Sequence, residues 1–209
     1  TPLYSSAASD VYKRQAPSYD PNKFVAGISQ KNYSSLLQSP GKPMFNRSIQ
    51  GQYPPASTVK PLFGLIGLER KSISKSTAIE DPGYFVMEGI ERPWRDHNSK
   101  RGGHGKGVDL AKAIIESCDV FFYHMGVKLG IDAMADDSKF FGLGSPTGID
   151  IPGEASGIMP SRDWKKRSRG ASWFNGDTIN MSIGQGFMLV TPLQLAVMTA
   201  RLASKGRQV

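Results

Sequence analysis

Cysteine is almost absent from this sequence of 209 residues, which contains only Cys118. A single thiol excludes a disulfide within the chain and is compatible with a reducing or an oxidising compartment. Long apolar runs are also missing, because the longest, Pro61–Leu68, is far shorter than the roughly 20 residues of a membrane-spanning helix. No charged segment followed by an apolar core opens the chain, so the sequence shows no signal peptide.

Acidic residues are outnumbered, with 18 Asp and Glu against 26 Lys and Arg, which gives a net charge of +8. This surplus favours an anionic neighbour such as nucleic acid, an acidic membrane surface or an acidic polymer, and it does not choose among them. Hydrophobic residues make up 39% and charged residues 21% of the chain. That balance excludes disorder throughout, and the length suits one domain with a sizeable core.

Apolar residues at helical spacing predict five helices. They are Thr58–Leu68, Val108–Glu116, Val120–Leu129, Ile131–Phe141 and Thr191–Ser204. The last begins with a threonine cap, a proline at the first helical position and Gln194 at the third, which is a capping box. Short strands are predicted at Gly83–Met87, Gly148–Ile151 and Thr178–Ile183. The fold class is therefore α/β or α+β, with helices in the majority.

The first fifteen residues, Thr1–Gln15, differ from the rest of the chain. They are small and polar without a periodic apolar pattern, and they resemble translated library-adaptor sequence. We therefore expect a non-native leader over residues 1–15 and a single domain over 16–209.

The segment Ser57-Thr58-Val59-Lys60 predicts a nucleophile and its base on one helical turn. Residues three apart share a face of a helix, so Ser57 Oγ and Lys60 Nζ are expected to converge. A serine hydroxyl needs a base that takes its proton, and a buried lysine can supply one. Pro54 and Pro55 exclude helix upstream, and the free amides of a helix start can stabilise an oxyanion.

Because an S-x-x-K segment often arises by chance, the prediction needs a second element. Ser117-Cys118-Asp119 supplies it, on a turn between two predicted helices where a second hydroxyl can face the first. A serine, a lysine and a second serine form the set shared by penicillin-binding proteins and class A β-lactamases.

Four further segments carry a specific resemblance. They are Ser18-Tyr19-Asp20-Pro21-Asn22, Tyr53-Pro54-Pro55-Ala56 before the nucleophile, Gly148-Ile149-Asp150, and Ile183-Gly184-Gln185-Gly186 followed by Thr191-Pro192-Leu193-Gln194. Their order resembles that of the class B penicillin-binding proteins, from about residue 16 to the end. Asp81-Pro82-Gly83, Arg95-Asp96, Gly103-His104-Gly105 and Trp164-Lys165 are similar to the elongation-type group of that class, penicillin-binding protein 2.

Two departures from the family pattern stand out. Asp119 ends the second motif where most of the class has asparagine, although an aspartate there is similar to the elongation-type group. The third motif, Lys-Thr/Ser-Gly on an active-site strand, is absent, and Ser204-Lys205-Gly206 is no substitute. The strand that precedes Ser18 in the family is missing too, so we expect a transpeptidase domain that is incomplete at both ends and stops before the third-motif strand.

The resemblance implies a penicillin-binding-protein/β-lactamase-like fold and a D,D-transpeptidase of the D-Ala-D-Ala carboxypeptidase class. Ser57 would attack the carbonyl between the two terminal D-alanines of a peptidoglycan stem peptide, with Lys60 as general base. Ser117 would pass a proton to the leaving amine, held by Asp119 and Lys60. An amine of a neighbouring stem peptide would then form the cross-link. β-Lactam antibiotics would stall at the acyl-enzyme, and no cofactor would be needed for catalysis.

The resemblance also implies one structural zinc held by Asp81, Asp96, His104 and Cys118. The residues alone favour the plainer interpretation of a buried cysteine, a solvated histidine and two turn aspartates, because the four are scattered and form no C-x-x-C pair. Members of the elongation-type group bind zinc with residues at these places. A metal at Cys118 would hold the second motif in place.

By the same resemblance, an anchor in the bacterial inner membrane, a periplasmic site and a membrane glycosyltransferase partner of the elongation complex are expected. Alternatives are a β-lactamase or β-lactam sensor of this fold, or a catalytically inactive scaffold of that complex. The Ile183–Gly186 and Thr191–Gln194 segments argue against a β-lactamase, and Ser57 with Lys60 argues against an inactive scaffold. A nucleic-acid partner, which rests on charge such as the run Lys165–Arg169, is not expected.

Overall fold

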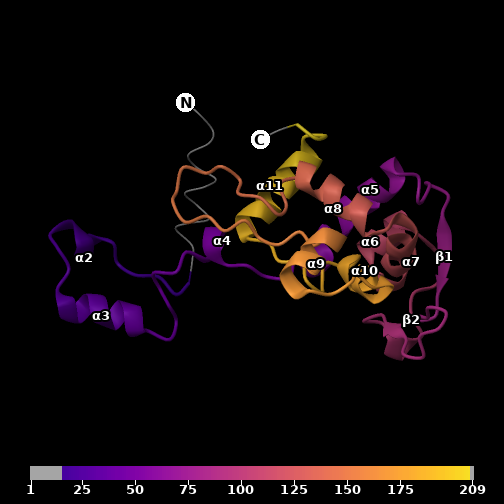
Figure 1. Ribbon diagram of the computed structural model, residues 1–209, viewed down its shortest axis with the longest axis horizontal. Coiled ribbons are helices and arrows are strands. Elements are labelled where there is room, and N and C mark those ends of the chain that lie inside the picture. Colours follow the sequence, from indigo (N-terminus) through magenta and orange to yellow (C-terminus); the bar gives the residue numbers. More distant parts are fainter. Residues whose placement is uncertain (1–15, 208–209) are drawn as a thin grey trace.

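The structure, a computed structural model, describes residues 16–207 and contains many helices and two small sheets (Figure 1). The helices are α2 (Asn22–Val25), α3 (Gln30–Gln38), α4 (Arg47–Gln50), the 3₁₀ turn η1 (Ala56–Val59), α5 (Lys60–Glu69), the 3₁₀ turn η2 (Ser99–Arg101), α6 (Leu110–Ile115), α7 (Asp119–Leu129), α8 (Ile131–Phe140), α9 (Arg162–Arg169), α10 (Asn175–Met181) and α11 (Pro192–Ala203). The strands are β1 (Ala78–Asp81), β2 (Tyr84–Phe85), β3 (Trp94–Arg95) and β4 (Gly105–Asp109). The predicted foreign leader, Thr1–Gln15, lies outside the described residues.

Helix α7 lies at the centre of the core. It packs against α5, α6, α8 and α10 and against β1, β2 and β3. Its buried side chains face more than one side of the helix and include Val120, Phe121, Phe122 and Met125. A helix that is apolar over most of its circumference is stable only when neighbours surround it. The turn that precedes α7 is therefore attached to a helix that neighbours hold on several sides.

The two sheets are small and antiparallel. β1 pairs with β4, with Ala78 opposite Asp109 and an irregularity between Ile79 and Asp81, and β2 pairs with β3. Helix α6 follows β4 directly, because the Asp109 side chain caps it by accepting a hydrogen bond from the amide of Lys112. The predicted class of mixed helices and strands, with helices in the majority, is confirmed.

The segment that contains α2 and α3 projects away from the other helices, at the left of Figure 1. Neither helix has a buried residue, and Val25 and Leu37 are exposed. Among residues 16–207, no helix combines the length and apolar character needed to cross a membrane.

The predicted helices are confirmed, with shifted ends. Pro61 is tolerated because it lies in the first turn of α5, which starts at Lys60. Backbone amides in a first turn have no partner within the helix, so the amide hydrogen that proline lacks is not missed. The capping box of α11 forms as predicted, since Thr191 and Gln194 exchange hydrogen bonds between side chain and backbone. The predicted helix Val108–Glu116 begins later than expected, because Val108 and Asp109 belong to β4.

Two of the three predicted strands are wrong. Residues Gly148–Ile151 form no strand, because the amides of Thr147 and Gly148 donate to the Glu154 carboxylate instead of to a neighbouring strand. The Thr178–Ile183 segment lies largely in helix α10. Its apolar residues are buried on several sides. The hydrophobic periodicity of such a short run does not distinguish a strand from a helix. The predicted strand Gly83–Met87 contains β2, which is shorter.

Candidate active site

Ser57 lies on the 3₁₀ turn η1, directly before α5 begins at Lys60. The preceding residue, Ala56, has a left-handed backbone with φ 49°, which is uncommon for a residue with a Cβ. Its amide donates a hydrogen bond to the carbonyl of Gly184 over 2.9 Å, and this contact holds the turn in place. Ser57 is exposed at the surface, whereas Lys60 is only 1% exposed.

The Lys60 ammonium is held by three acceptors from the second motif. Lys60 Nζ donates to the carbonyl of Ser117 over 2.7 Å, to Ser117 Oγ over 3.1 Å and to Asp119 Oδ1 over 2.6 Å. It also lies 5.4 Å from the centre of the Phe122 ring, whose face attracts a cation. All three ammonium hydrogens are thus used, which fixes the lysine in one position.

Ser117 connects this lysine to the predicted nucleophile. Its hydroxyl donates a hydrogen bond to Ser57 Oγ over 3.0 Å while it accepts one from Lys60 Nζ. The sequence predicted that Ser57 and Lys60 converge. The hydrogen bonds between these described residues join them through Ser117 rather than directly. The three residues therefore form one continuous chain along which a proton can move.

The turn between α6 and α7 presents Ser117 to this site. Ser117 has a left-handed backbone with φ 56°. Cys118, next to it, caps α7 through its Sγ, which accepts the amide of Phe121 over 3.4 Å, and its own amide donates to the carbonyl of Ala113. A strained backbone conformation persists only where the surrounding structure holds it in place. The buried helix α7 holds the conformation of this turn.

The four predicted metal ligands come together beside the second motif. The nearest ligand atoms of Asp81, Asp96, His104 and Cys118 all lie within 4.8 Å of one another. Asp81 ends β1, Asp96 follows β3, His104 precedes β4 and Cys118 precedes α7. His104 Nδ1 lies 2.6 Å from Asp81 Oδ2, and Cys118 Sγ donates to the same oxygen over 3.3 Å. We call these four residues the Asp81 cluster.

Burial shapes the acid–base properties of this cluster. Burial acts to raise the pKa of the Asp81 carboxyl, but hydrogen bonds from His104, Gly83 and Cys118 outweigh it and hold that pKa below its usual range. Burial, opposed by the Phe121 amide and reinforced by the nearby Asp81 charge, raises the pKa of the Cys118 thiol to about 12. In the absence of a cation, the cluster therefore holds a carboxylate next to a protonated thiol.

Asp96 joins the cluster to the second motif, a link that the sequence did not predict. Its Oδ2 accepts the backbone amide of Asp119 over 2.6 Å, and Oδ1 lies 3.1 Å from Nδ1 of the exposed His97. Asp96, His97 and Asp119 form a second group of three possible metal ligands. The contact of Ala56 with Gly184 was missed as well, because no spacing in the sequence indicates which distant backbone groups meet.

Glycines make tight backbone turns possible just before β4 and in the segment Gly184–Gly186. Gly102, Gly103, Gly105, Gly184 and Gly186 all have positive φ. A Cβ on Gly103 would lie 2.2 Å from the Gly83 amide nitrogen, so this glycine permits a backbone contact that shapes the Asp81 cluster.

A serine that is hydrogen-bonded through a second serine to a buried lysine is the arrangement of serine enzymes that form covalent acyl intermediates. The sequence matches the family described as penicillin binding protein transpeptidase domain over residues 11–209. The chain belongs to this family.

Relatives support this assignment. The chain is 46% identical over 194 residues to the peptidoglycan D,D-transpeptidase MrdA of Acinetobacter baumannii, a match that covers 93% of this chain and 28% of that protein. It therefore spans less than a third of the length of this curated relative.

Solved structures of penicillin-binding protein 2 (PBP2) share the fold. Pseudomonas aeruginosa PBP2 in complex with WCK 5153 has a TM-score of 0.86 and 44% identity, covering 91% of this chain and 41% of that one. The complex between PBP2 and MreC from Helicobacter pylori contains a chain with a TM-score of 0.85 and 37% identity, covering 91% of this chain and 35% of that one. The predicted penicillin-binding-protein transpeptidase fold is thus confirmed.

Proposed function

We propose that the complete protein is a peptidoglycan D,D-transpeptidase that acts through an acyl-enzyme on Ser57. The observation that carries this proposal is the chain of hydrogen bonds from Ser57 through Ser117 to Lys60 and Asp119. Relatives that carry the name peptidoglycan D,D-transpeptidase, together with family membership, support it.

In the proposed acylation, Ser57 Oγ attacks the carbonyl carbon between the two terminal D-alanines of a stem peptide. The hydroxyl proton of Ser57 passes to Ser117 Oγ as the Ser117 proton passes to Lys60. This path reverses the hydrogen bonds that Ser117 makes to Ser57 and Lys60, so it requires Lys60 in its neutral amine form. The bond to the last D-alanine then breaks, and its nitrogen takes a proton back along the same chain. The products are a Ser57 ester and free D-alanine.

The second step consumes this ester. An amine of a neighbouring stem peptide attacks the ester carbonyl, forms the cross-linking amide and returns the proton to Ser57. Attack by water instead would give the carboxypeptidase reaction. Asp119 holds Lys60 and thereby keeps the proton path aligned in both steps.

We further propose that the Asp81 cluster holds one structural zinc. The donor set of two carboxylate oxygens, one imidazole nitrogen and one sulfur is one that zinc accepts in tetrahedral sites. Asp81 and Asp96 are 0% and 2% exposed, and buried carboxylates commonly pair with a positive charge or bind a metal. Such an ion would supply that positive charge and fix Cys118, and with it the direction of Ser117. No step of the reaction passes through it.

The proposed setting is the periplasmic face of the bacterial inner membrane, within the elongation complex. Peptidoglycan stem peptides and β-lactam antibiotics are the proposed ligands, and a membrane glycosyltransferase is a proposed partner. MreC is a further candidate, because the Helicobacter pylori relative is in a complex with it.

Fluorescent penicillin tests this function in the complete protein. The label should attach covalently at Ser57, as peptide mapping can show, and Ser57→Ala should abolish it. A label on another residue would overturn the assignment. Rapid release of hydrolysed penicillin would instead favour a β-lactamase, and no labelling of a folded protein would favour an inactive scaffold.

A further inference from the structure

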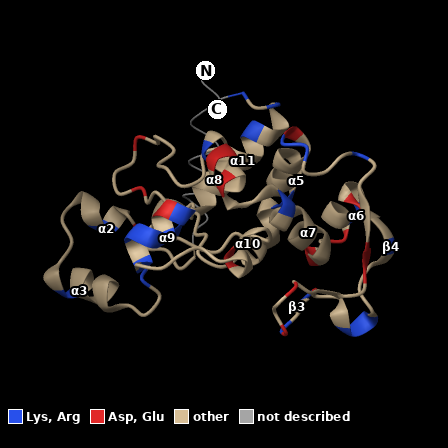
Figure 2. Ribbon diagram, turned by 45° about the vertical axis from the view of Figure 1, so that its right-hand side comes forward, with Lys and Arg blue, Asp and Glu red and all other residues tan. Residues whose placement is uncertain are grey.

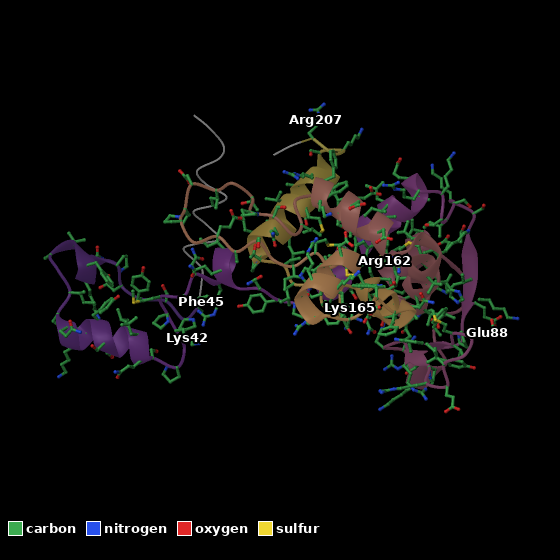
Figure 3. All side chains as sticks on the ribbon, viewed as in Figure 1. Lys42, Phe45, Glu88, Arg162, Lys165 and Arg207 are labelled. Atoms are coloured by element: carbon green, nitrogen blue, oxygen red, sulfur yellow. The ribbon has the colours of Figure 1, made fainter. Side chains whose placement is uncertain are left out.

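Lys165 differs from the other cations of α9. Figure 2 shows lysine and arginine positions along α9 in blue. The other cations of this helix are exposed, whereas Lys165 is only 6% exposed. Lys165, labelled in Figure 3, places its Nζ 2.5 Å from Oδ2 of Asp177 in the first turn of α10. The amide of Phe174 donates to the same oxygen over 2.8 Å. The ion pair therefore ties α9, the loop after it and the start of α10 together.

Aromatic rings enclose the Lys165 ammonium. The ring centres of Phe174, Phe187 and Trp173 lie 4.7, 5.4 and 5.8 Å from Nζ. A cation at these distances is attracted to the ring faces, and the attraction grows when water is excluded. We call Lys165, Asp177 and the three rings the Lys165 cage.

Phe187 is the member of the cage that leads to the nucleophile. It lies in the segment 184–190, whose two ends both hydrogen-bond to the residues before Ser57. At one end the Gly184 carbonyl accepts the Ala56 amide over 2.9 Å. At the other end, Val190 and Tyr53 exchange two backbone hydrogen bonds of 2.9 Å each. Phe187 lies between these two attachments in the sequence, and its ring belongs to the cage.

The contact between the two backbones leaves little freedom. A Cβ on Gly184 would lie only 2.3 Å from the carbonyl oxygen of Ala56, so the segment 184–190 and the nucleophile turn touch directly. A shift of Phe187 that reaches Gly184 would therefore move the backbone of Ala56, and with it the hydroxyl of Ser57.

We propose that Lys165 is a positioning residue for Ser57, acting through Phe187 and the segment 184–190. The inference rests on the proposed acylation at Ser57. A buried ion pair is weak support for stability, because well-packed apolar residues often replace it without loss. In this proposal the ion pair serves to fix Phe187, whose ring also packs against Trp164 and Trp173 at 5.4 and 6.3 Å between centres. Lys165 touches neither Ser57 nor Lys60 in any hydrogen bond of the described residues.

The test uses the complete protein and the variant Lys165→Met, which keeps the length of the side chain and removes its charge. Fluorescent penicillin acylation is measured over a range of concentrations to separate the dissociation constant from the acylation rate at saturation. Lys166→Met is the matched control, because Lys166 is exposed on the same helix. Phe187→Leu tests the next step of the path while it leaves the ion pair in place.

Lys165→Met is expected to lower the saturating acylation rate by roughly tenfold to a hundredfold, because small misplacements of a reacting group have effects of that size. Its dissociation constant should stay within about twofold, as expected when binding groups are intact. Phe187→Leu should behave alike, and Lys165→Arg should recover part of the rate. Lys166→Met should match the wild type.

A purely structural role predicts a different pattern. If Lys165→Met melts at a lower temperature but acylates at the wild-type saturating rate well below that temperature, the positioning role is wrong. If Lys165→Met does not fold, Phe187→Leu decides by the same criterion. A wild-type protein that is not labelled at Ser57 would refute the proposed function itself, which separates the two failures.

Discussion

The backbone amide of Asp119 donates a hydrogen bond to Asp96 Oδ2 over 2.6 Å, while the Asp119 carboxylate accepts one from Lys60 over the same distance. One residue thus connects the Asp81 cluster to the lysine that is proposed as the base. Because Asp96 is only 2% exposed, water cannot easily replace this bond. Any change that moves the cluster is expected to reach the reacting groups through Asp119.

Replacing Lys60 by methionine should stop acylation with little change in the shape of the site. The variant removes the proposed base, and general-base catalysis contributes about 10² to 10⁴ in rate. It also leaves Asp119 without its partner, so the protein should be less stable. Stopped-flow labelling with fluorescent penicillin and thermal unfolding measure both effects. Acylation at the wild-type rate would remove Lys60 from the mechanism.

The zinc proposal predicts about one zinc per chain in the complete protein, as expected for a closed four-ligand site. Cys118→Ser should lose the metal and label more slowly at Ser57, although no reacting group has been changed. His97→Ala is the matched control, since His97 belongs to the alternative group with Asp96 and Asp119 and should be dispensable. Elemental analysis decides, and metal retained by Cys118→Ser but lost from His97→Ala would assign the ion to that other group.

Zinc affinity should fall as the pH falls. Burial raises the pKa of the Cys118 thiol to about 12 in the metal-free protein, so metal binding must release the thiol proton. Protons compete with the metal for the thiol, and this competition strengthens at lower pH. Competition with a chelator at pH 6 and pH 8 should show tighter binding at pH 8. Equal affinities at the two values would contradict coordination by the thiol.

Alanine at Gly184 should disturb the nucleophile more than alanine at Gly170. Both glycines have left-handed backbones, with φ 70° and 63°. An alanine there costs about 1–2 kcal/mol for the backbone alone. A Cβ on Gly170 meets nothing within 4 Å, whereas one on Gly184 would collide with the Ala56 carbonyl. Gly184→Ala should therefore lose about 1–3 kcal/mol more by urea unfolding and acylate more slowly. Equal behaviour of the two variants would show that the contact is unimportant.

His124 should make the protein less stable in acid. Burial lowers the pKa of its imidazole, whose ring edge meets Phe85 with 4.8 Å between centres, while the Asp81 charge partly opposes this effect. The unfolded chain therefore takes up the proton more readily, and stability is lost as the pH falls through about 6.5, the ordinary range for histidine. Part of the ring is exposed, so the slope must stay below about 1.4 kcal/mol per pH unit, the limit for one proton. Urea unfolding of wild type and His124→Gln at pH 7.5 and 5.5 should show a flatter dependence in the variant.

The parts of the fold that could be predicted are those whose signals are local. The cap of α11 and the start of α5 at Lys60 depend on side chains within a few residues, so the sequence predicts them well. The Thr178–Ile183 segment could not be assigned, because its burial on several sides comes from α7 and the other elements around it. The failure at Gly148 has the same origin, since the Glu154 carboxylate takes the amides that a strand would have used.

The sequence indicated which residues form the candidate site, but not how they are arranged. Residue types and the resemblance to the family indicated Ser57, Lys60, Ser117, Asp119 and the Asp81 cluster, and the structure brings them together in two adjoining groups. The order of the hydrogen bonds, with Ser117 between Ser57 and Lys60, could not be predicted, because it depends on where α7 places its first turn. Neither could the Lys165 cage, whose cation and rings come from three separate segments.

The reactivity of Cys118 toward thiol reagents can report on local opening of the structure. It is the only thiol in the sequence, it is 0% exposed and it is the residue next to Ser117. A reagent that modifies thiols can reach it only when the structure around Cys118 opens and any bound metal has left. In the metal-free protein the modification rate therefore measures how often the surroundings of the second hydroxyl leave their folded position. That measurement needs no introduced label.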